Sequence, residues 1–328
     1  MVRGDSELLV CGTINWDTLL FVQKLPTPGG EIEVQNVATA PGGKGANTAV
    51  SAARILGPAR VGLLATLGTD EIARRQIKEL RREGVVTTGI LTRGTKSGSA
   101  FVLVDGEGQD MILTNMGANG LMTANFLSKN QRVSEIIQNA RVVVITDPPL
   151  DASLWIARQA KKRGAILVLS PALLTSYGLE RLRDYLLLAD FIIINEQEAA
   201  ALLDSDKGSH SSATLSRILG ESTVIVTLGN RGCAISSGGK NAMVPTIDLS
   251  SLGLKVVSTA GAGDAFVGTF AAFKIKGLQD IHSVFRANIS AALKTTKSQI
   301  RGSPRLQQIE RFAKRKEVAS ILREIRFT

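Results

Sequence analysis

The sequence is poor in aromatic residues and in cysteine. Phe, Trp and Tyr make up 4% of the 328 residues, so the core must consist mostly of aliphatic side chains and alanine. The two cysteines, Cys11 and Cys233, both lie within apolar runs. We therefore expect buried thiols in a reducing compartment rather than a disulfide or a metal site.

Long hydrophobic runs are missing as well. No stretch reaches the ~18 uninterrupted apolar residues of a membrane helix, and the opening MVRGDSELLV lacks the apolar core of a secretory signal. These absences predict a cytoplasmic protein without membrane contact. With 44% hydrophobic and 21% charged residues, the chain has the composition of a globular protein.

The net charge of +10 has two explanations, a nucleic-acid partner or an acidic small-molecule ligand. In segments such as RRQIKELRREG the bases alternate with acids, at spacings that allow pairing along a helix. The two Trp and two Tyr residues are not interleaved with basic clusters, so they offer no stacking platform for bases. We therefore expect no nucleic-acid partner and favour a phosphate-bearing ligand.

Short aliphatic runs alternate with helical patterns along most of the chain. The expected strands are ELLVC, VGLLAT, RVVVIT, AILVLS, FIIIN and TVIVTL, and the expected helices span 45–56, 70–83, 151–163, 176–188, 196–203 and 213–220. Nearly continuous Val, Ile and Leu is typical of strands buried on both faces. The alternation predicts an α/β fold with a mostly parallel central sheet flanked by helices on both faces. After residue 260 the chain is expected to be mostly helical.

Two segments break this alternation, 15–40 and 98–114. Both read as short strands joined by Gly/Pro turns, and we expect them to form a small separate sheet that acts as a lid. An exposed flat sheet is prone to edge pairing, so substrate or a partner subunit should cover it. No linker divides the chain, which predicts one α/β domain over 1–328 with the lid inserted.

The stretch STAGAGDAF carries the strongest chemical signal. Gly261 and Gly263 allow a tight turn that opens a helix, whose free N–H groups and positive dipole end suit an anion such as a transferring phosphate. We interpret Gly261, Ala262 and Gly263 as an anion cradle, and Asp264 as a base that takes a proton from a hydroxyl. The alternative for Asp264 is an ordinary helix cap.

Three further motifs are compatible with ligand binding. In APGGKGAN, Lys44 and Asn47 fall on the first turn of a helix and suit sugar hydroxyls or a phosphate, or else Lys44 is simply solvated. In INEQEA, Asn195 ends an apolar strand and Glu198 follows, as a ligand pair or as a capping box. In GTINWD, Asp17 is a hydroxyl acceptor or a turn acid.

Taken in order, these motifs resemble the signatures of the ribokinase-like, or PfkB, family of carbohydrate kinases. GGKGANTAVSAARILG is similar to the first signature and STAGAGDAFVGTF to the second, with N-x-D, GANG, N-x-x-E and TLGNRG between or before them. The resemblance runs from about residue 7 to residue 303. GGKGAN together with N-x-D is similar to the ribokinases within the family.

The resemblance implies a role for each matched residue. It implies Asp264 as the general base and Gly261, Ala262 and Gly263 as the anion hole. It implies that the sugar is held by Asn15, Asp17, Gly43, Lys44, Asn47, Asp147 and Asp264, where Asp147 stands in place of a usual Glu. It implies that ATP is bound by Asn195, Thr227, Gly229, Gly263 and Asn288, and that Glu198 serves Mg²⁺ indirectly.

The resemblance also implies a monovalent cation site at Ser258, Ala260 and Ser303. This chain departs from the pattern there, because Ser258 stands where an Asp is common and Gln299 where a Gly is usual. An uncharged Ser would hold K⁺ less well, so K⁺ activation is not expected to be strong.

The function implied is an ATP-dependent sugar kinase that uses Mg²⁺, with D-ribose as acceptor and ribose 5-phosphate as product. Small-molecule sugar and ATP are the expected partners, and the family fold predicts a homodimer through the lid. Two alternatives stay open: a nucleoside or fructokinase-type kinase of the same fold, and a catalytically silent ligand-binding relative. The intact GAGD, with Asp264, argues against the silent relative.

Overall fold

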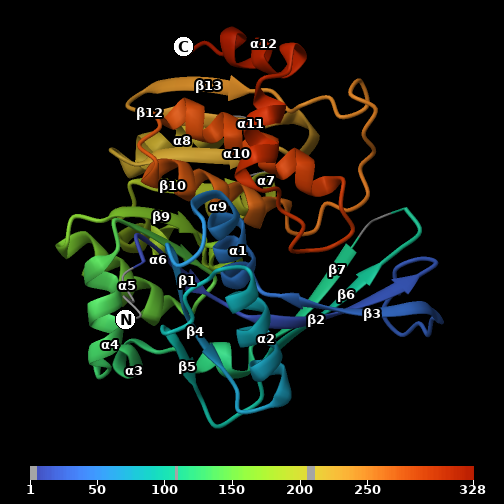
Figure 1. The fold of residues 1–328 in the computed structure, drawn as a ribbon, viewed down its shortest axis with the longest axis vertical. Coiled ribbons are helices and arrows are strands. Elements are labelled where there is room, and N and C mark those ends of the chain that lie inside the picture. The colour runs from blue at the N-terminus through green and yellow to red at the C-terminus, as the bar shows by residue number, and fades with distance from the viewer. Residues whose placement is uncertain (1–5, 108–109, 205–210) are drawn as a thin grey trace.

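The computed structural model describes residues 6–107, 110–204 and 211–328, which fold into two sheets and surrounding helices (Figure 1). The large sheet has nine strands in the order β13-β12-β11-β10-β9-β8-β1-β4-β5. Its strands are β1 Leu8–Gly12, β4 Val61–Leu67, β5 Ile90–Thr92, β8 Val142–Thr146, β9 Ile166–Ser170, β10 Phe191–Asn195, β11 Thr223–Thr227, β12 Cys233–Ser237 and β13 Lys240–Val244. All neighbours pair in parallel except β12, which is antiparallel to both β11 and β13.

The six strands expected from aliphatic runs are all present, and they form the centre of the large sheet. Every residue of β1, β4 and β8 is buried, as expected for strands covered on both faces. The predicted mostly parallel sheet is confirmed. The cysteines lie in β1 and β12, and both are buried free thiols, as the composition indicated.

Helices cover both faces of the large sheet. On one face α1 packs on β1, β4 and β8, and α9 packs on α1 and α10; on the other, α5 packs on β8 and β9, while α7 and α8 cover β10 to β12. The helices are α1 Lys44–Leu56, α2 Glu71–Arg82, α3 Ala124–Ser128, α4 Gln131–Asn139, α5 Leu150–Lys162, α6 Gly178–Leu186, α7 Glu196–Leu203, α8 Ser211–Leu219, α9 Ala262–Ile275, α10 Asp280–Thr295, α11 Leu306–Ala313 and α12 Lys316–Glu324. Short 3₁₀ turns lie at Gly117–Leu121, Ala172–Tyr177 and Gly229–Arg231. None of the helices in the described ranges is long and apolar enough to cross a membrane.

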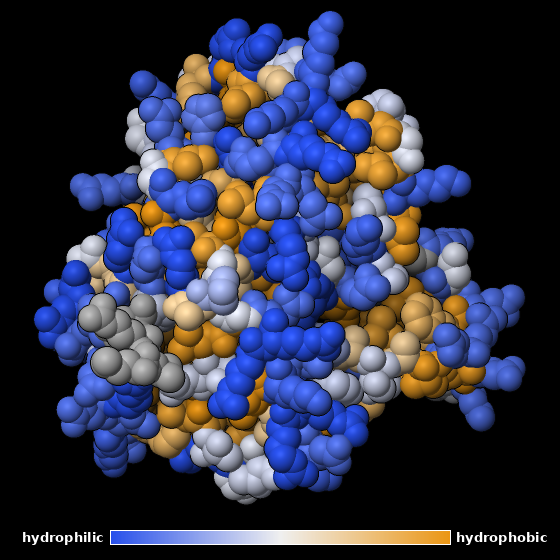
Figure 2. Space-filling model, viewed as in Figure 1, coloured by the Kyte–Doolittle hydropathy of each residue, from blue (hydrophilic) through white to orange (hydrophobic). Residues whose placement is uncertain are grey.

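The second sheet has four strands in the order β3-β2-β6-β7 and projects from the body at the right of Figure 1. Its strands are β2 Asn15–Val22, β3 Val34–Gly42, β6 Gly98–Val104 and β7 Asp110–Asn115. They fall within or next to the two segments expected to leave the main alternation, and 108–109 lie outside the described residues. Exposed apolar side chains gather on this sheet and colour that part of Figure 2 orange: Val34, Val37, Phe101, Met111, Ile112 and Leu113.

The order of the strands determines where a ligand can bind. From β1 the chain proceeds to β4 on one side, and later strands start again at β8 on the other side of β1. Such a switch point leaves a crevice at the carboxyl ends of neighbouring parallel strands, which is where open α/β sheets bind ligands. The small sheet continues from the carboxyl end of β1, since β2 begins at Asn15. It therefore stands beside this crevice.

Candidate active site

Two adjoining cavities lie at the carboxyl edge of the large sheet. The first has a volume of about 1250 Å³ and the second of about 540 Å³. They share four lining residues, Asn195, Thr227, Thr259 and Gly263. A ligand in one cavity can therefore meet a ligand in the other at this junction.

The smaller cavity contains all the residues expected to hold a sugar. They come from the segment after β1, the start of α1, the end of β8 and the first turn of α9: Asn15, Asp17, Gly43, Lys44, Asn47, Asp147 and Asp264. The small sheet closes one side through Leu19, Phe21 and Val102. The structure thus brings together polar groups that are up to 249 positions apart in the sequence, from Asn15 to Asp264.

Asp264 does not cap its own helix. The N-cap of α9 is Gly261, with φ of 80° and no side-chain capping bond. The Asp264 carboxylate instead accepts a hydrogen bond from Nδ2 of Asn47 at 2.8 Å, 217 positions away. Of the two readings of this acid, the cap is therefore excluded, and the carboxylate lies in the cavity beside the glycine turn.

Burial raises the pKa of Asp264 above its ordinary value. Lys44, the hydrogen bond from Asn47, Arg301 and Lys294 oppose that rise. The carboxyl is thus desolvated yet surrounded by positive charge, which is the arrangement of a general base that must accept a proton and release it again.

Lys44 and Asp147 form an electrostatic pair across the cavity. Burial lowers the pKa of Lys44, but the carboxylates of Asp147, Asp264 and Glu198 outweigh it and the net change is upward. Burial raises the pKa of Asp147 to about 6, against the effect of Lys44. Asp147 has a left-handed φ of 66° and accepts a hydrogen bond from the Leu173 N–H at 3.1 Å. Lys44 is therefore not a simply solvated side chain.

Asp17 lies against the backbone of Gly42. A Cβ at position 42 would overlap the Asp17 carboxylate, so glycine is needed there for this acid to enter the cavity. In the described part of the chain Oδ1 of Asp17 is buried without a hydrogen-bond partner. Burial raises the pKa of this carboxyl to about 6, with Arg301 opposing. An orphaned buried acceptor facing a cavity indicates a ligand that donates to it.

Arg301 is a site residue that the sequence reading missed. Its guanidinium donates from Nε to Oδ1 of Asn47 at 3.0 Å, and from Nη2 to the Gly42 carbonyl at 2.8 Å and to Oε1 of Gln76 at 3.0 Å. Gln76 in turn donates to the Asn15 carbonyl at 2.5 Å. Arg301 thus orients three parts of the sugar-facing wall. An isolated arginine in QIRGSP carries no signal that distinguishes it from a surface charge.

Asn119, in the GANG motif, is a second positioning residue. Its Oδ1 accepts from the Ile14 N–H at 3.0 Å, and its Nδ2 donates to Oδ1 of Asn15 at 2.9 Å. This holds the Asn15 amide in one orientation. The motif was recognisable in the sequence, but its contact with Asn15 was not.

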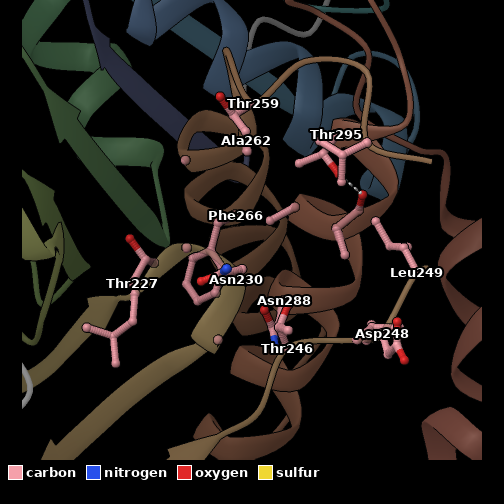
Figure 3. A pocket seen from close by; sticks show the side chains of 18 of the residues that line it. Thr227, Asn230, Thr246, Asp248, Leu249, Thr259, Ala262, Phe266, Asn288 and Thr295 are labelled. Atoms are coloured by element: carbon pink, nitrogen blue, oxygen red, sulfur yellow. Dashed lines mark hydrogen bonds between the residues drawn. The ribbon is translucent and has the colours of Figure 1, made fainter. Parts of the chain in front are cut away.

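The larger cavity is lined by every residue expected on the nucleotide side: Asn195, Thr227, Gly229, Gly263 and Asn288. Figure 3 shows its side chains around an open space, with Thr259 and Ala262 at one end and Thr246 and Asn288 at the other. Phe266 contributes an apolar surface. Asn288 donates to the Pro245 carbonyl at 2.7 Å and so holds the segment after β13.

Asn195 and Glu198 form the capping box that was the alternative reading. Glu198 N–H donates to Oδ1 of Asn195 at 2.8 Å, and the Asn195 N–H donates to Oε2 of Glu198 at 3.0 Å. Both residues nevertheless line the smaller cavity, and Asn195 lines both cavities. The box therefore places Asn195 at the junction and Glu198 in the smaller cavity, so the two interpretations are compatible.

The donor set at the junction suits Mg²⁺ held mainly by its substrate. The described residues contain no group of three or more His, Cys, Asp or Glu side chains that could bind a metal by themselves. Mg²⁺ commonly keeps several waters and is bound by one or two protein oxygens together with phosphates. The Glu198 carboxylate, whose charge reaches Lys44, fits this indirect role.

An acid beside a glycine turn at a helix N-terminus, in a cavity that adjoins a second one, is the arrangement expected of a phosphotransferase with a hydroxyl acceptor. Residues 5–305 match the model of the pfkB family carbohydrate kinases. The chain belongs to this family, and it is an enzyme that transfers a phosphoryl group from ATP to a sugar hydroxyl.

Curated relatives support the assignment. The chain is 30% identical over 298 residues to a ribokinase of Haemophilus influenzae, covering 89% of this chain and 93% of that protein. It is 31% identical over 272 residues to the bifunctional ribokinase/ribose-5-phosphate isomerase A of Fructilactobacillus sanfranciscensis; this covers 81% of the chain but only 48% of that longer protein.

A solved structure agrees with the fold. The ribokinase of Arabidopsis thaliana, complexed with ribose and ATP, superposes with a TM-score of 0.80 at 25% identity, covering 94% of this chain and 99% of that one. The predicted ribokinase-like architecture is thereby confirmed.

Proposed function

We propose that the protein transfers the γ-phosphate of ATP to the 5-hydroxyl of D-ribose, giving ribose 5-phosphate. The observation that carries this proposal is the Asp264 carboxylate, which lies in the smaller cavity next to Gly263, a residue that lines both cavities, and is held by Asn47 at 2.8 Å. The similarity to the ribokinase of Haemophilus influenzae over most of both chains supports ribose as the acceptor.

The sugar would lie in the smaller cavity, with its hydroxyls shared among acceptors and donors. Asp17 offers an unpaired buried oxygen, and Asn47 has one amide hydrogen bond to Asp264 and one from Arg301. Lys44, Asn15, Gly43 and Asp147 complete the proposed set. Several hydrogen bonds to one ligand would orient the attacking oxygen, and orientation accounts for much of the acceleration in phosphoryl transfer.

Asp264 would take the proton from the attacking hydroxyl. Burial raises the pKa of Asp264, which makes its carboxylate a stronger base, while the positive groups around it keep it ionised. The N–H groups of Gly261 and Gly263 in the glycine turn would stabilise the charge on the transferring phosphoryl group. The Ala262 N–H donates to the Thr259 carbonyl at 3.0 Å and would have to leave it to join them. No covalent intermediate with the protein is needed.

ATP would occupy the larger cavity, with Thr227, Gly229, Asn288 and Asn195 along it and Gly263 at the junction. We propose that Mg²⁺ is bound by phosphate oxygens and water, with Glu198 as an indirect partner, and that when bound it neutralises phosphate charge. Lys44 would meet the same charge from the sugar side, since it lines the smaller cavity.

We further propose that the chain is one domain whose small sheet acts as a lid over the sugar. Exclusion of water by the lid would limit wasteful hydrolysis of ATP. The exposed apolar residues of this sheet suggest that two lids pair in a homodimer. A reducing, cytoplasmic location accords with the two free buried cysteines.

A panel of acceptors tests the function. ADP release would be measured with ribose, deoxyribose, fructose and nucleosides, and the phosphorylated product identified by NMR. We expect the highest kcat/KM for ribose, with phosphate on the 5-hydroxyl. A preference for a nucleoside or a ketohexose would replace the acceptor but keep the mechanism. The absence of ADP release with every acceptor would favour a catalytically silent binding protein.

The Asp264→Asn variant tests the mechanism. We expect kcat to fall by at least ~100-fold with ATP binding retained, because the general base is lost while the shape is kept. The matched control is Asp184→Asn on an exposed position of α6, which should leave kcat unchanged. Near-normal turnover of Asp264→Asn would contradict the assignment of the base.

A further inference from the structure

Lys294 is a buried lysine that the proposed mechanism does not use. It lies in the last turn of α10 with its side chain fully buried, and its ammonium donates a hydrogen bond to the carbonyl of Ser258 at 3.0 Å. Burial lowers the pKa of Lys294 to about 8, and the Asp264 carboxylate opposes that fall. Lysine is almost never fully buried unless it is paired. The desolvation cost therefore requires a compensating role.

The same end of α10 holds Ser258 through its backbone. The Thr295 carbonyl accepts hydrogen bonds from the N–H groups of Val257 at 2.7 Å and Ser258 at 3.0 Å. Both the N–H and the carbonyl of Ser258 are thus bound to α10, three residues before Gly261. The negative dipole end of α10 also stabilises the ammonium. Lys294 and the Thr295 carbonyl thus hold Ser258 from both sides, just before the glycine turn.

The charge of Lys294 also reaches Asp264. It lowers the pKa of that carboxyl, together with Lys44 and the Asn47 amide on α1 and Arg301 on the segment after α10. Lys294 approaches the turn from α10, whereas Lys44 approaches from α1, so positive charge surrounds the reacting groups from two sides.

The residues expected to bind a monovalent cation do not fit one. Such an ion needs unoccupied oxygen ligands, yet the Ser258 carbonyl accepts from the Lys294 ammonium. The Ser303 carbonyl accepts from Nη1 of Arg54 at 2.6 Å, and the same atom donates to the Arg301 carbonyl at 2.7 Å. Side-chain cations thus bind the carbonyls of Ser258 and Ser303, two of the three expected ligands, and a further cation beside them would be repelled.

We propose that Lys294 is a positioning residue that takes the place of an exchangeable monovalent cation, so that the glycine turn is held in its working geometry without K⁺. This inference rests on the proposed phosphoryl transfer. Arg54 has the equivalent role at Ser303, whose carbonyl it binds, and it also pairs with Glu83 at 2.6 Å. Two side chains of the protein, Lys294 and Arg54, thus supply the positive charge that a bound ion would otherwise supply.

The first test uses the unmodified protein. Turnover and melting temperature would be measured in choline chloride and in KCl, each at about 100 mM so that ionic screening is equal. We expect kcat to differ by less than about twofold between the two salts, because the charge at the turn is already present. Activation by K⁺ of about tenfold or more, or a specific rise in melting temperature with KCl, would overturn the proposal.

The second test uses Lys294→Met, which keeps the length of the side chain and removes its charge. The expected kcat is lower by about tenfold or more, as for loss of one electrostatic contact at a transition state. The acid limb of the kcat/KM profile should move to higher pH, because Asp264 loses a charge that lowers its pKa, while Lys44, Arg301 and the Asn47 amide remain. Lys294→Arg should restore part of the rate.

The matched control is Lys276→Met, an exposed lysine at the far end of α9, which should change neither kcat nor the pH profile. An unchanged kcat and acid limb in Lys294→Met would overturn the inference. If that variant does not fold, the salt comparison on the unmodified protein decides alone. If the unmodified protein phosphorylates no acceptor, the proposed function fails, and the melting comparison in the two salts still tests the replacement of K⁺.

Discussion

At the scale of single residues, the site consists of acids that are costly to bury. Asp17 and Asp147 both have pKa values raised to about 6, chiefly by burial. An ionised carboxylate in such a place destabilises the fold unless a ligand donates to it. The acids proposed to recognise the sugar therefore lower the stability of the folded protein when no ligand is bound.

Replacing Asp17 tests this trade-off through pH. A carboxyl whose pKa is raised in the folded state stabilises the protein at low pH, and this contribution is lost as pH rises through about 6. At pH ~7.5 the Asp17→Asn variant should thus be more stable than wild type, with a larger free energy of unfolding. At pH ~5 this advantage should be smaller by ~1–2 kcal/mol.

Urea unfolding at the two pH values measures the difference, and the sugar KM should rise in the same variant. An Asp184→Asn variant provides the exposed comparison. A gap between Asp17→Asn and wild type that does not change with pH would contradict the raised pKa.

The sequence identified the proposed general base, Asp264, but not the basic residues that surround it. Asp264 stands out because a glycine turn precedes it, and such a turn has a specific backbone meaning. Lys294 and Arg301 have no comparable signal, because any lysine or arginine in a helix or loop can be solvated. Their burial follows from the packing of α10 on α9 and from the contact of the segment after α10 with α1, over separations that a local pattern does not contain.

At the scale of elements, the seam between α1 and α9 is made of small residues. Gly268 on α9 contacts α1 so closely that a Cβ would overlap the Thr48 carbonyl. Next to it, Ser51 donates to the Ala265 carbonyl at 3.1 Å, and Thr269 donates to Ser290 of α10 at 2.8 Å. This close approach brings Asn47 of α1 within reach of Asp264 of α9.

The Gly268→Ala variant should be destabilised, although alanine normally favours a helix interior by ~1 kcal/mol over glycine. We expect the unfolding free energy to fall by ~1–3 kcal/mol, because the added methyl group forces the two helices apart. Urea denaturation provides the measurement. Gly120→Ala is the control, since its Cβ would make only an ordinary contact at 3.5 Å with Met116. Equal or greater stability of Gly268→Ala would refute the close seam.

The strands divide into those that the sequence revealed and those that it did not. Runs such as FIIIN are recognisable because strands buried on both faces need continuous aliphatic side chains. β12 and β13 were not expected, since CAISS and KNAMV mix small, polar and charged residues at the edge of the sheet. β5 has only three residues, too few for a periodic pattern.

At the scale of the whole molecule, the small sheet exposes more apolar surface than a lid alone needs. Val37, Ile112 and Leu113 are each more than half exposed, at 57%, 57% and 56%. Val37 and Leu113 lie on one face of the sheet, whereas Ile112 lies on the opposite face and lines the smaller cavity. An exposed apolar face such as the first is typical of an interface between subunits. The proposed homodimer would bury it and protect the sheet edges as well.

Leu113→Asp tests the dimer, because a carboxylate placed in an apolar interface is not compensated. We expect the wild type to be a dimer and the variant a monomer by light scattering coupled to size-exclusion chromatography. Leu187→Asp, at an exposed leucine next to α6, should leave the dimer intact. A monomeric wild type, or a variant that still dimerises, would count against pairing through the lid.

The bonds of Arg301 to Gly42, Asn47 and Gln76 join a late part of the chain to an early one. During translation the first βα units leave the ribosome long before residue 301 is made. Until then the wall of the sugar cavity lacks the guanidinium that orients it, and the glycine turn lacks the end of α10. A nascent chain that ends before this point is consequently inert, and catalysis begins only after residue 301 has been made.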